Sequence, residues 1–300
     1  MDLNLRLVRY FVAVADAGTF TKAAEQLHIA TPSLSQQVRK LEETLGVSLL
    51  ERDHRGARPT AAGQDFLEES RVLLAAAESA VGAARRHQRS SSGKVRLGFL
   101  AGGAGELTRP IIDEFHRREP QVELELTQLA WGDELSALTS GRVDMVVARP
   151  PLESHPRLRR VVLFEEPRVL LMAHDHPLAR RRKLRIADLA DVVQVDTREG
   201  TRDWRNWWSI DPRPDGTRPT YGPMVNSIEE MVQVVATTDA VAITGAGVAG
   251  LFRRADTTSR LIADAAPSTV ELVFLASDMP SAVERFVAVA LGLSAVLGTR

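Results

Sequence analysis

The chain has no cysteine among its 300 residues. This absence excludes disulfide bridges, thiolate zinc sites and cysteine nucleophiles, and it is typical of proteins from a reducing compartment. No stretch approaches the roughly 20 uninterrupted apolar residues that a membrane-spanning helix requires. Met1 leads into charged sequence with a helical pattern, unlike the apolar core of a signal peptide. We therefore expect a cytoplasmic protein that contacts no membrane.

An excess of positive charge, which would directly indicate a nucleic-acid partner, is also lacking. The chain carries 38 Lys and Arg residues against 39 Asp and Glu residues, and the charges of its first 60 residues nearly cancel. A DNA-binding surface would therefore have to be a local basic face. With 44% hydrophobic and 26% charged residues, the composition predicts a globular protein of about two domains, each of roughly 150 residues.

The first 45 residues contain three helical patterns separated by short turns. Apolar residues at helical spacing predict a first helix over residues 4–16, which ends at Gly18. Thr19 is expected to cap a second helix. A third is expected to begin at Thr31, as the cap, and Pro32, which is well tolerated at the first helical position.

The third helix is expected to have one apolar and one polar face. The apolar positions are Leu34, Val38, Leu41 and Leu45, and the polar face carries Ser33, Gln36, Gln37 and Lys40, flanked by Ser35 and Arg39. Hydroxyl, amide and cationic groups of this kind contact phosphates and read base edges in a major groove. We expect Ser35 and Gln36 to read bases and Lys40 to hold phosphate. Two helices with a tight turn predict a helix-turn-helix, although a surface helix of a small bundle would show the same periodicity.

A compact basic hairpin is expected after these helices. Residues 49–52 and 57–59 flank its turn, which contains Arg55 and Gly56. We expect this hairpin to serve as a wing, with Arg52 and Arg55 holding phosphates against the DNA backbone or the minor groove.

Five segments of this region resemble the DNA-binding domain of the LysR family of bacterial transcription regulators almost without gaps. They are residues 10–15, 18–28, 33–42, 45–52 and 60–63. The sequence departs from the family pattern at Thr31, where glutamine is usual, and at Gln36, where arginine is frequent. The resemblance implies contacts to double-stranded promoter DNA from Thr31, Pro32, Ser33, Ser35, Gln36, Gln37, Arg39, Lys40, Arg52, Arg55 and Arg58.

Residues 1–60 are thus expected to be a winged helix-turn-helix domain and residues 61–89 a linker helix. A heptad-like seam runs along this helix through Phe66, Ser70, Leu73, Ala77, Ala80 and Ala84. The seam predicts pairing with a second helix or packing on the helix's own domain. The family resemblance favours a homodimer, which would assemble further into a tetramer and have RNA polymerase as a candidate partner. Residues 90–93 are expected to form a hinge.

From Lys94 the pattern changes to strands that alternate with helices, which predicts parallel sheets flanked by helices. This part resembles the effector domain of LysR regulators, which is related to periplasmic binding proteins. The expected fold class is therefore α/β: an all-α winged helix-turn-helix with a long linker helix, followed by a two-lobed effector domain over residues 94–300. Lobe I is expected at about 94–164 and 268–300, and lobe II at about 165–267.

A small-molecule effector is expected between the lobes, where ligands bind beyond the carboxyl ends of strands. Gly102 and Gly103 lie in a strand-to-helix loop whose N–H groups could anchor an anion, and Trp131 offers an aromatic surface. We hypothesise a small aromatic, anionic effector that changes lobe closure. The predicted effector-binding residues are Gly102, Gly103, Gln128, Trp131, Asp196, Thr197, Thr201 and Asn226.

Other functions have weaker support. Residues 245–250 satisfy G-x-G-x-x-G and Asp264 lies at the distance of a ribose contact, but the βαβ context is incomplete. His174 and His176 lack a third metal ligand nearby. The helical face of Trp204, Trp207 and Trp208 suits core or inter-lobe packing better than ligand stacking. We expect no catalytic residues, no metal and no cofactor, and therefore no enzyme.

Overall fold

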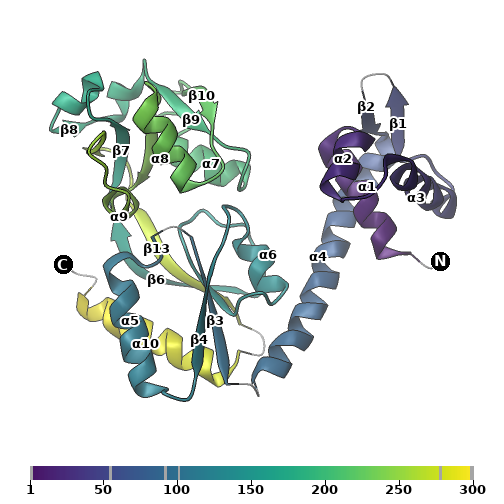
Figure 1. The fold of residues 1–300 in the computed structure, drawn as a ribbon, viewed down its shortest axis with the longest axis horizontal. Coiled ribbons are helices and arrows are strands. Elements are labelled where there is room, and N and C mark those ends of the chain that lie inside the picture. The colour runs from purple at the N-terminus through teal and green to yellow at the C-terminus, as the bar shows by residue number, and fades with distance from the viewer. Residues whose placement is uncertain (1–2, 54–55, 91–92, 101, 277–278, 298–300) are drawn as a thin grey trace. The chain divides into compact units, whose positions relative to one another are not determined.

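The computed structural model describes residues 3–53, 56–90, 93–100, 102–276 and 279–297. The chain divides into two compact units, Met1–Val81 and Gly82–Arg300. Figure 1 shows the course of the chain. No helix within the described residues has both the length and the apolar character needed to cross a membrane.

The N-terminal unit consists of three helices, a hairpin and the first part of a long helix. These elements are α1 (Leu5–Ala17), α2 (Phe20–Gln26), α3 (Thr31–Leu45), β1 (Leu50–Asp53), β2 (Gly56–Pro59) and α4 (Ala61–Ser90). β1 and β2 are antiparallel, as the hairpin prediction requires. Thr19 caps α2, as predicted, through its side-chain oxygen. The cap of α3 is Ala30, so the prediction for Thr31 was one residue late: Thr31 and Pro32 both lie in the first turn.

The core of this unit is formed by the predicted apolar stripes of α1 and α3. Phe11, Leu34 and Val38 are completely buried. α4 contributes Leu67, and Phe66 packs against the ring of Phe11 with centroids 5.4 Å apart. The second turn of α4 therefore belongs to the core of the N-terminal unit.

Gly63 lets α4 begin directly against the hairpin. A Cβ atom at this position would lie 1.9 Å from the carbonyl oxygen of Leu49. Thr60 fixes the same junction, because its backbone N–H donates to Leu49 O at 2.9 Å and its hydroxyl donates to Ser48 O at 2.9 Å. The hydroxyl oxygen of Thr60 also accepts from the N–H of Gly63.

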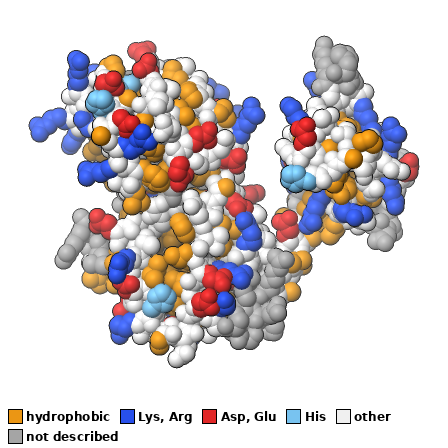
Figure 2. Space-filling model, in the orientation of Figure 1, with side chains coloured by type: hydrophobic (Ala, Val, Ile, Leu, Met, Phe, Trp, Pro, Cys, Tyr) orange, Lys and Arg blue, Asp and Glu red, His pale blue; other side chains and the backbone are white. Residues whose placement is uncertain are grey.

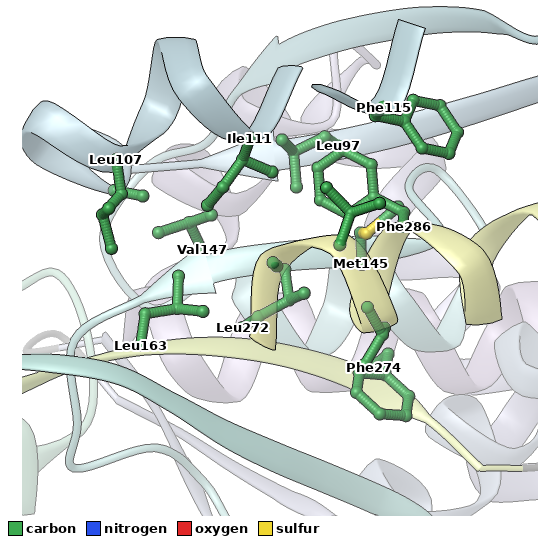
Figure 3. Close-up of a cluster of buried hydrophobic side chains, with 14 of the residues drawn as sticks. Leu97, Leu107, Ile111, Phe115, Met145, Val147, Leu163, Leu272, Phe274 and Phe286 are labelled. Carbon is green, nitrogen blue, oxygen red and sulfur yellow. The ribbon is translucent and has the colours of Figure 1, made fainter. Parts of the chain in front are cut away.

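The C-terminal unit contains a five-stranded sheet in the order β4-β3-β5-β13-β6. Its strands are β3 (Lys94–Phe99), β4 (Glu123–Gln128), β5 (Met145–Ala148), β6 (Leu158–Glu166) and β13 (Ser268–Leu275). β3 is parallel to β4 and β5, whereas β13 is antiparallel to β5 and β6. Helices α5 (Thr108–Arg118) and α10 (Ser281–Leu297) pack with this sheet around a core that includes Phe115, Met145 and Phe286 (Figure 3). The short elements η1 (Gly105–Leu107) and α6 (Glu134–Thr139) complete this part.

A second, four-stranded sheet in the order β11-β7-β12-β8 lies in the middle of the sequence. Its strands are β7 (Arg168–Ala173), β8 (Lys183–Leu184), β11 (Ala242–Gly245) and β12 (Thr257–Ile262). It is accompanied by η2 (Pro177–Arg180), η3 (Ile186–Leu189), the parallel pair β9 (Val193–Asp196) and β10 (Thr220–Met224), and helices α7 (Arg202–Ser209), α8 (Ile228–Thr237) and α9 (Ala246–Leu251). The central strand β7 is antiparallel to both β11 and β12. The expectation of wholly parallel sheets was therefore wrong, because strand and helix order does not specify which strands pair.

The chain passes from the first sheet to the second between β6 and β7, at Pro167, and returns between β12 and β13. The predicted lobe boundary at residue 164 falls inside β6. α4 continues to Ser90, so the predicted hinge at 90–93 overlaps the helix end and otherwise falls partly outside the described residues.

Candidate functional site

The exposed face of α3 carries polar and cationic side chains. Leu34, Val38 and Leu41 turn inward. Pro32, Ser33, Gln36, Arg39 and Lys40 are exposed, whereas Thr31, Ser35 and Gln37 are half-buried. Figure 2 shows Lys and Arg side chains on the surface of the N-terminal unit. The face can donate hydrogen bonds to phosphates and exchange amide hydrogen bonds with base edges.

Arg52 connects the hairpin to α3. Its guanidinium donates to Ser35 Oγ at 2.9 Å, pairs with Glu42 Oε2 at 3.3 Å and lies 4.6 Å from the ring centre of Phe20. Glu42 Oε1 in turn accepts from the N–H groups of Leu49 and Leu50 at 2.8 and 3.1 Å. The predicted base reader Ser35 and the predicted phosphate contact Arg52 thus bind each other in the DNA-free chain.

Of the two remaining predicted wing residues, the structure describes Arg58 but not Arg55. Arg58 is exposed on β2, where its guanidinium has access to solvent. Arg55 lies outside the described residues.

A cavity of about 90 Å³ lies in the C-terminal unit between the parts built on its two sheets. Leu100, Trp131 and Arg149 line it from the first part. The second part contributes aromatic and polar groups, among them Gln194, Asp196, Thr197, Trp204, Arg205, Trp208 and Tyr221. We call this cavity the inter-lobe pocket.

Three of the predicted effector-binding residues line the inter-lobe pocket: Trp131, Asp196 and Thr197. Thr201 caps α7 through its hydroxyl and lines a neighbouring, smaller cavity. Gln128 and Asn226 are exposed and are not among the lining residues.

Gly102 and Gly103 line a different cavity, of about 370 Å³ and mostly apolar. The N–H of Gly103 donates to Leu100 O at 2.9 Å, and its carbonyl oxygen accepts from Arg149 Nη1 at 3.2 Å. The loop leads into the short η1 before α5 begins. The expected anion anchor on this loop is therefore not a feature of the inter-lobe pocket.

Four residues that line the inter-lobe pocket were not named by the sequence prediction: Arg149, Gln194, Trp204 and Trp208. Arg149 comes directly after β5, so the rule that selected residues beyond strand ends could have found it. Trp204 and Trp208 were noted as a helical face but assigned to packing. Gln194 lies inside β9 and is buried, and its position in the sequence gave no signal.

The charges around the inter-lobe pocket are arranged in pairs. Arg205 binds Asp196 with two hydrogen bonds, of 2.5 and 3.1 Å, and lies over the ring of Tyr221. Burial raises the pKa of the Tyr221 hydroxyl, which donates to Asp211 at 3.0 Å. Arg149 donates from Nε to Glu166 Oε1 at 2.6 Å, with both side chains 5% exposed.

The glycine-rich segment at 245–250 has a role other than nucleotide binding. Glu166 Oε2 accepts from the N–H of Gly247 at 2.9 Å, and a Cβ on Gly245 would lie 2.1 Å from Glu166 Oε1. β11 and β12, the strands before and after α9, are not neighbours in the sheet, because β7 lies between them and is antiparallel to both. Among the described residues, no group of three or more His, Cys, Asp or Glu side chains is placed to hold a metal.

Comparisons with known proteins agree with this architecture. Residues 5–64 match the family model described as bacterial regulatory helix-turn-helix protein, lysR family, and residues 88–294 match the LysR substrate binding domain. The chain is 38% identical over 195 residues to the Hca operon transcriptional activator HcaR of Escherichia coli, which covers 65% of each protein. It is 35% identical over 189 residues to the HTH-type transcriptional regulator AlsR of Bacillus subtilis, covering 63% of this chain and 62% of that one. The matched segments thus span slightly less than two thirds of these relatives.

Solved structures show the same fold over nearly the whole chain. CbnR, a LysR family transcriptional regulator, has a TM-score of 0.55 and 25% identity, with 96% of this chain and 100% of that chain covered. Full-length CbnR complexed with its target DNA has a TM-score of 0.55 and 24% identity, with 97% and 100% covered. Full-length BenM has a TM-score of 0.58 and 24% identity, with 99% and 98% covered. With both family models matched in order along the sequence, the chain belongs to the LysR family of bacterial helix-turn-helix regulators.

Proposed function

We propose that the chain is a sequence-specific DNA-binding transcription regulator whose activity is modulated by a small molecule in the inter-lobe pocket. The observation that carries this proposal is the exposed polar face of α3, held beside a basic hairpin by the Arg52–Glu42 pair. The relatives are named as transcription regulators, and one neighbouring structure contains target DNA. The proposal assigns no catalytic residue, and a cytoplasmic location stays a prediction.

Within the DNA interface, we assign base reading to Gln36 and phosphate contacts to Arg39, Lys40 and Arg58. Gln36 has an exposed amide that can form two hydrogen bonds with adenine. Ser35 and Arg52 satisfy each other, so they would contact DNA only if their hydrogen bond rearranged. Their principal role in this proposal is to set the angle of the hairpin.

The test is a footprint on the DNA upstream of the chain's own gene, compared with binding to a random duplex. Gln36→Ala should weaken operator binding by about 1–3 kcal/mol and leave random-duplex binding almost unchanged. Gln64→Ala, which removes an exposed amide on α4, is the matched control and should bind like the wild type. Equal losses on both duplexes would show that Gln36 does not read sequence.

We further propose that the chain forms a homodimer through α4. Beyond the first turns, this helix exposes apolar side chains: Val72 is 66%, Leu73 36% and Val81 52% exposed. A symmetric DNA reader needs two recognition helices at a fixed separation, so a second copy of the chain is the occupant we assign to this face. Assembly to a tetramer and contact with RNA polymerase remain predictions.

Effector control would act through closure of the two lobes. A ligand can shift this equilibrium only by the difference in its affinity for the two arrangements. Trp131, which lines the inter-lobe pocket, gives the test. Trp131→Ala should remove the effect of a responsive metabolite on the footprint while effector-free DNA binding stays at the wild-type level. A variant that still responded at wild-type concentrations would place the effector elsewhere.

A further inference from the structure

Four buried nitrogen donors around the inter-lobe pocket have no hydrogen-bond partner among the described residues. They are Arg149 Nη2, Gln194 Nε2, Trp204 Nε1 and Trp208 Nε1. A buried donor without a partner destabilises a fold, and native proteins contain few of them. Their concentration in the lining of one cavity indicates that a ligand completes these hydrogen bonds.

All four groups donate, so the missing partner is rich in acceptors. Asp196, the carboxylate that lines the pocket, is already paired with Arg205. The described lining therefore offers a cationic ligand no unpaired carboxylate. Arg149 is likewise paired, with Glu166, but its Nη2 keeps N–H groups without a partner. A ligand carboxylate would accept from these N–H groups, and hydrogen bonds to charged groups are the stronger ones.

The shape of the lining adds a second requirement. The rings of Trp131 and Trp204 lie 5.5 Å apart at 39°, and Trp208 follows at 6.2 Å from Trp204. These indoles form an aromatic wall of the pocket, and two of the four donors are the ring nitrogens of Trp204 and Trp208. Aromatic side chains favour offset or edge contacts with another ring, so this wall suits a planar aromatic ligand.

Arg149 also connects the pocket to both parts of the unit. Its Nη1 donates to the Gly103 loop of the first part, and its Nε binds Glu166 at the end of β6. The other oxygen of Glu166 accepts from Gly247 in α9 of the second part. A ligand that binds Nη2 would therefore contact a hydrogen-bond chain that spans the two parts.

We propose that the inter-lobe pocket binds an aromatic carboxylate, with Arg149 as the anchor of its carboxylate and the Arg149–Glu166–Gly247 chain as the link from ligand to lobe arrangement. This inference rests on the proposed effector-controlled function. It replaces the glycine loop, which the sequence suggested as the anchor, by a buried guanidinium.

The experiment measures thermal unfolding of the full chain with matched probes. The acids are benzoate and phenylacetate, and the comparison compounds are benzamide, phenylacetamide, benzylamine and cyclohexanecarboxylate. At 100-fold over its Kd, an acid should raise Tm by about 5–10 °C. Each amide should bind roughly 10- to 100-fold more weakly than its acid, because it loses one hydrogen bond between charged groups. Benzylamine should give no shift, and cyclohexanecarboxylate should bind more weakly than benzoate.

Two variants locate the carboxylate. The double variant Arg149→Met with Glu166→Met removes the anchor without leaving a buried charge, and it should bind acid and amide equally. Gln194→Leu removes one spare donor at similar volume and should weaken acid binding several-fold while leaving the ligand-free Tm unlowered. Arg109→Met changes an arginine that is 89% exposed and does not line the pocket, and it should bind acids like the wild type.

The inference is overturned if no acid in the series shifts Tm, if amides or the amine bind as well as the acids, or if the double variant keeps the acid preference. The footprint separates this inference from the proposed function. Acid binding without any change in the footprint would contradict effector control and leave the pocket chemistry intact. If the footprint responded to a metabolite while the pocket showed no acid preference, the aromatic-carboxylate inference would fail and effector control would stand.

Discussion

The buried pair Arg149–Glu166 should behave as one unit in a double-mutant cycle. Both side chains are 5% exposed, with no second charged partner for either within the described contacts. Arg149→Met leaves the Glu166 carboxylate charged and buried, and Glu166→Met does the same to the guanidinium. Removing one member of such a pair costs about 3–5 kcal/mol. Replacing both by methionine removes both charges, so the main losses are two hydrogen bonds, from the N–H of Gly247 to Glu166 and from Arg149 to Gly103 O, together about 1–3 kcal/mol.

Urea unfolding, followed by tryptophan fluorescence, measures this cycle in the C-terminal unit. All four tryptophans lie between residues 131 and 208, so the signal reports the C-terminal unit alone. We expect each single variant to be less stable than the double variant, with a coupling free energy of at least about 3 kcal/mol. If the double variant lost as much stability as the two single variants together, the residues would act independently and the proposed link between the lobes would fail.

Three further predictions concern other parts of the chain. Arg58→Ala should weaken binding to operator and random duplex alike and reduce the salt dependence, with the slope of log K against log salt about one unit shallower; an unchanged slope would exclude a phosphate contact. Leu73→Asp should shift the sedimenting mass towards the monomer, whereas Gln64→Asp on the opposite side of α4 should not; a wild-type mass for both would refute the α4 dimer. Burial raises the pKa of Glu134, so its contribution to stability is complete below the unfolded pKa of about 4.3 and is lost as pH rises through the higher folded pKa. Glu134→Gln should therefore gain stability relative to wild type from pH 4 to pH 7 in thermal unfolding, and a difference independent of pH would contradict this.

The helix-turn-helix could be predicted closely because its signals are local. The stripe of Leu34, Val38 and Leu41 and the cap at Thr19 fix helix position within a few residues of sequence. For α4, local sequence signals do not predict what each apolar residue packs against. Phe66 and Ser70 fit the heptad seam, but both are covered within the N-terminal unit, and the exposed part of the seam begins only at Leu73. Residues that pack in a domain core and residues that pack against a partner helix have the same apolar spacing. Spacing alone therefore does not distinguish the two kinds of contact.

The pocket was harder to predict because its chemistry depends on pairing between distant segments. Trp131 and Asp196 were found by their places after strands. Gln194 could not be found in this way, since it matters only because its amide is buried without a partner. The glycines at 245 and 247 looked like a phosphate loop, and only the three-dimensional structure shows that a carboxylate from Glu166, about 80 residues earlier, occupies that position.

Under the proposed function, the junction at Gly63 would determine how motion reaches the DNA. α4 starts so close to the hairpin that a methyl group would not fit, and the N–H groups of Leu49 and Leu50 bind Glu42 of α3. These contacts hold together α3 (the proposed reading helix), the β1–β2 hairpin (the proposed wing) and the first turns of α4, so we expect them to move as one rigid body. In a dimer, the distance between the two reading helices would be set by the angle at which the paired α4 helices cross. A small rotation at that crossing would be magnified at the DNA in proportion to the length of the arm, about 45 Å for a helix of 30 residues.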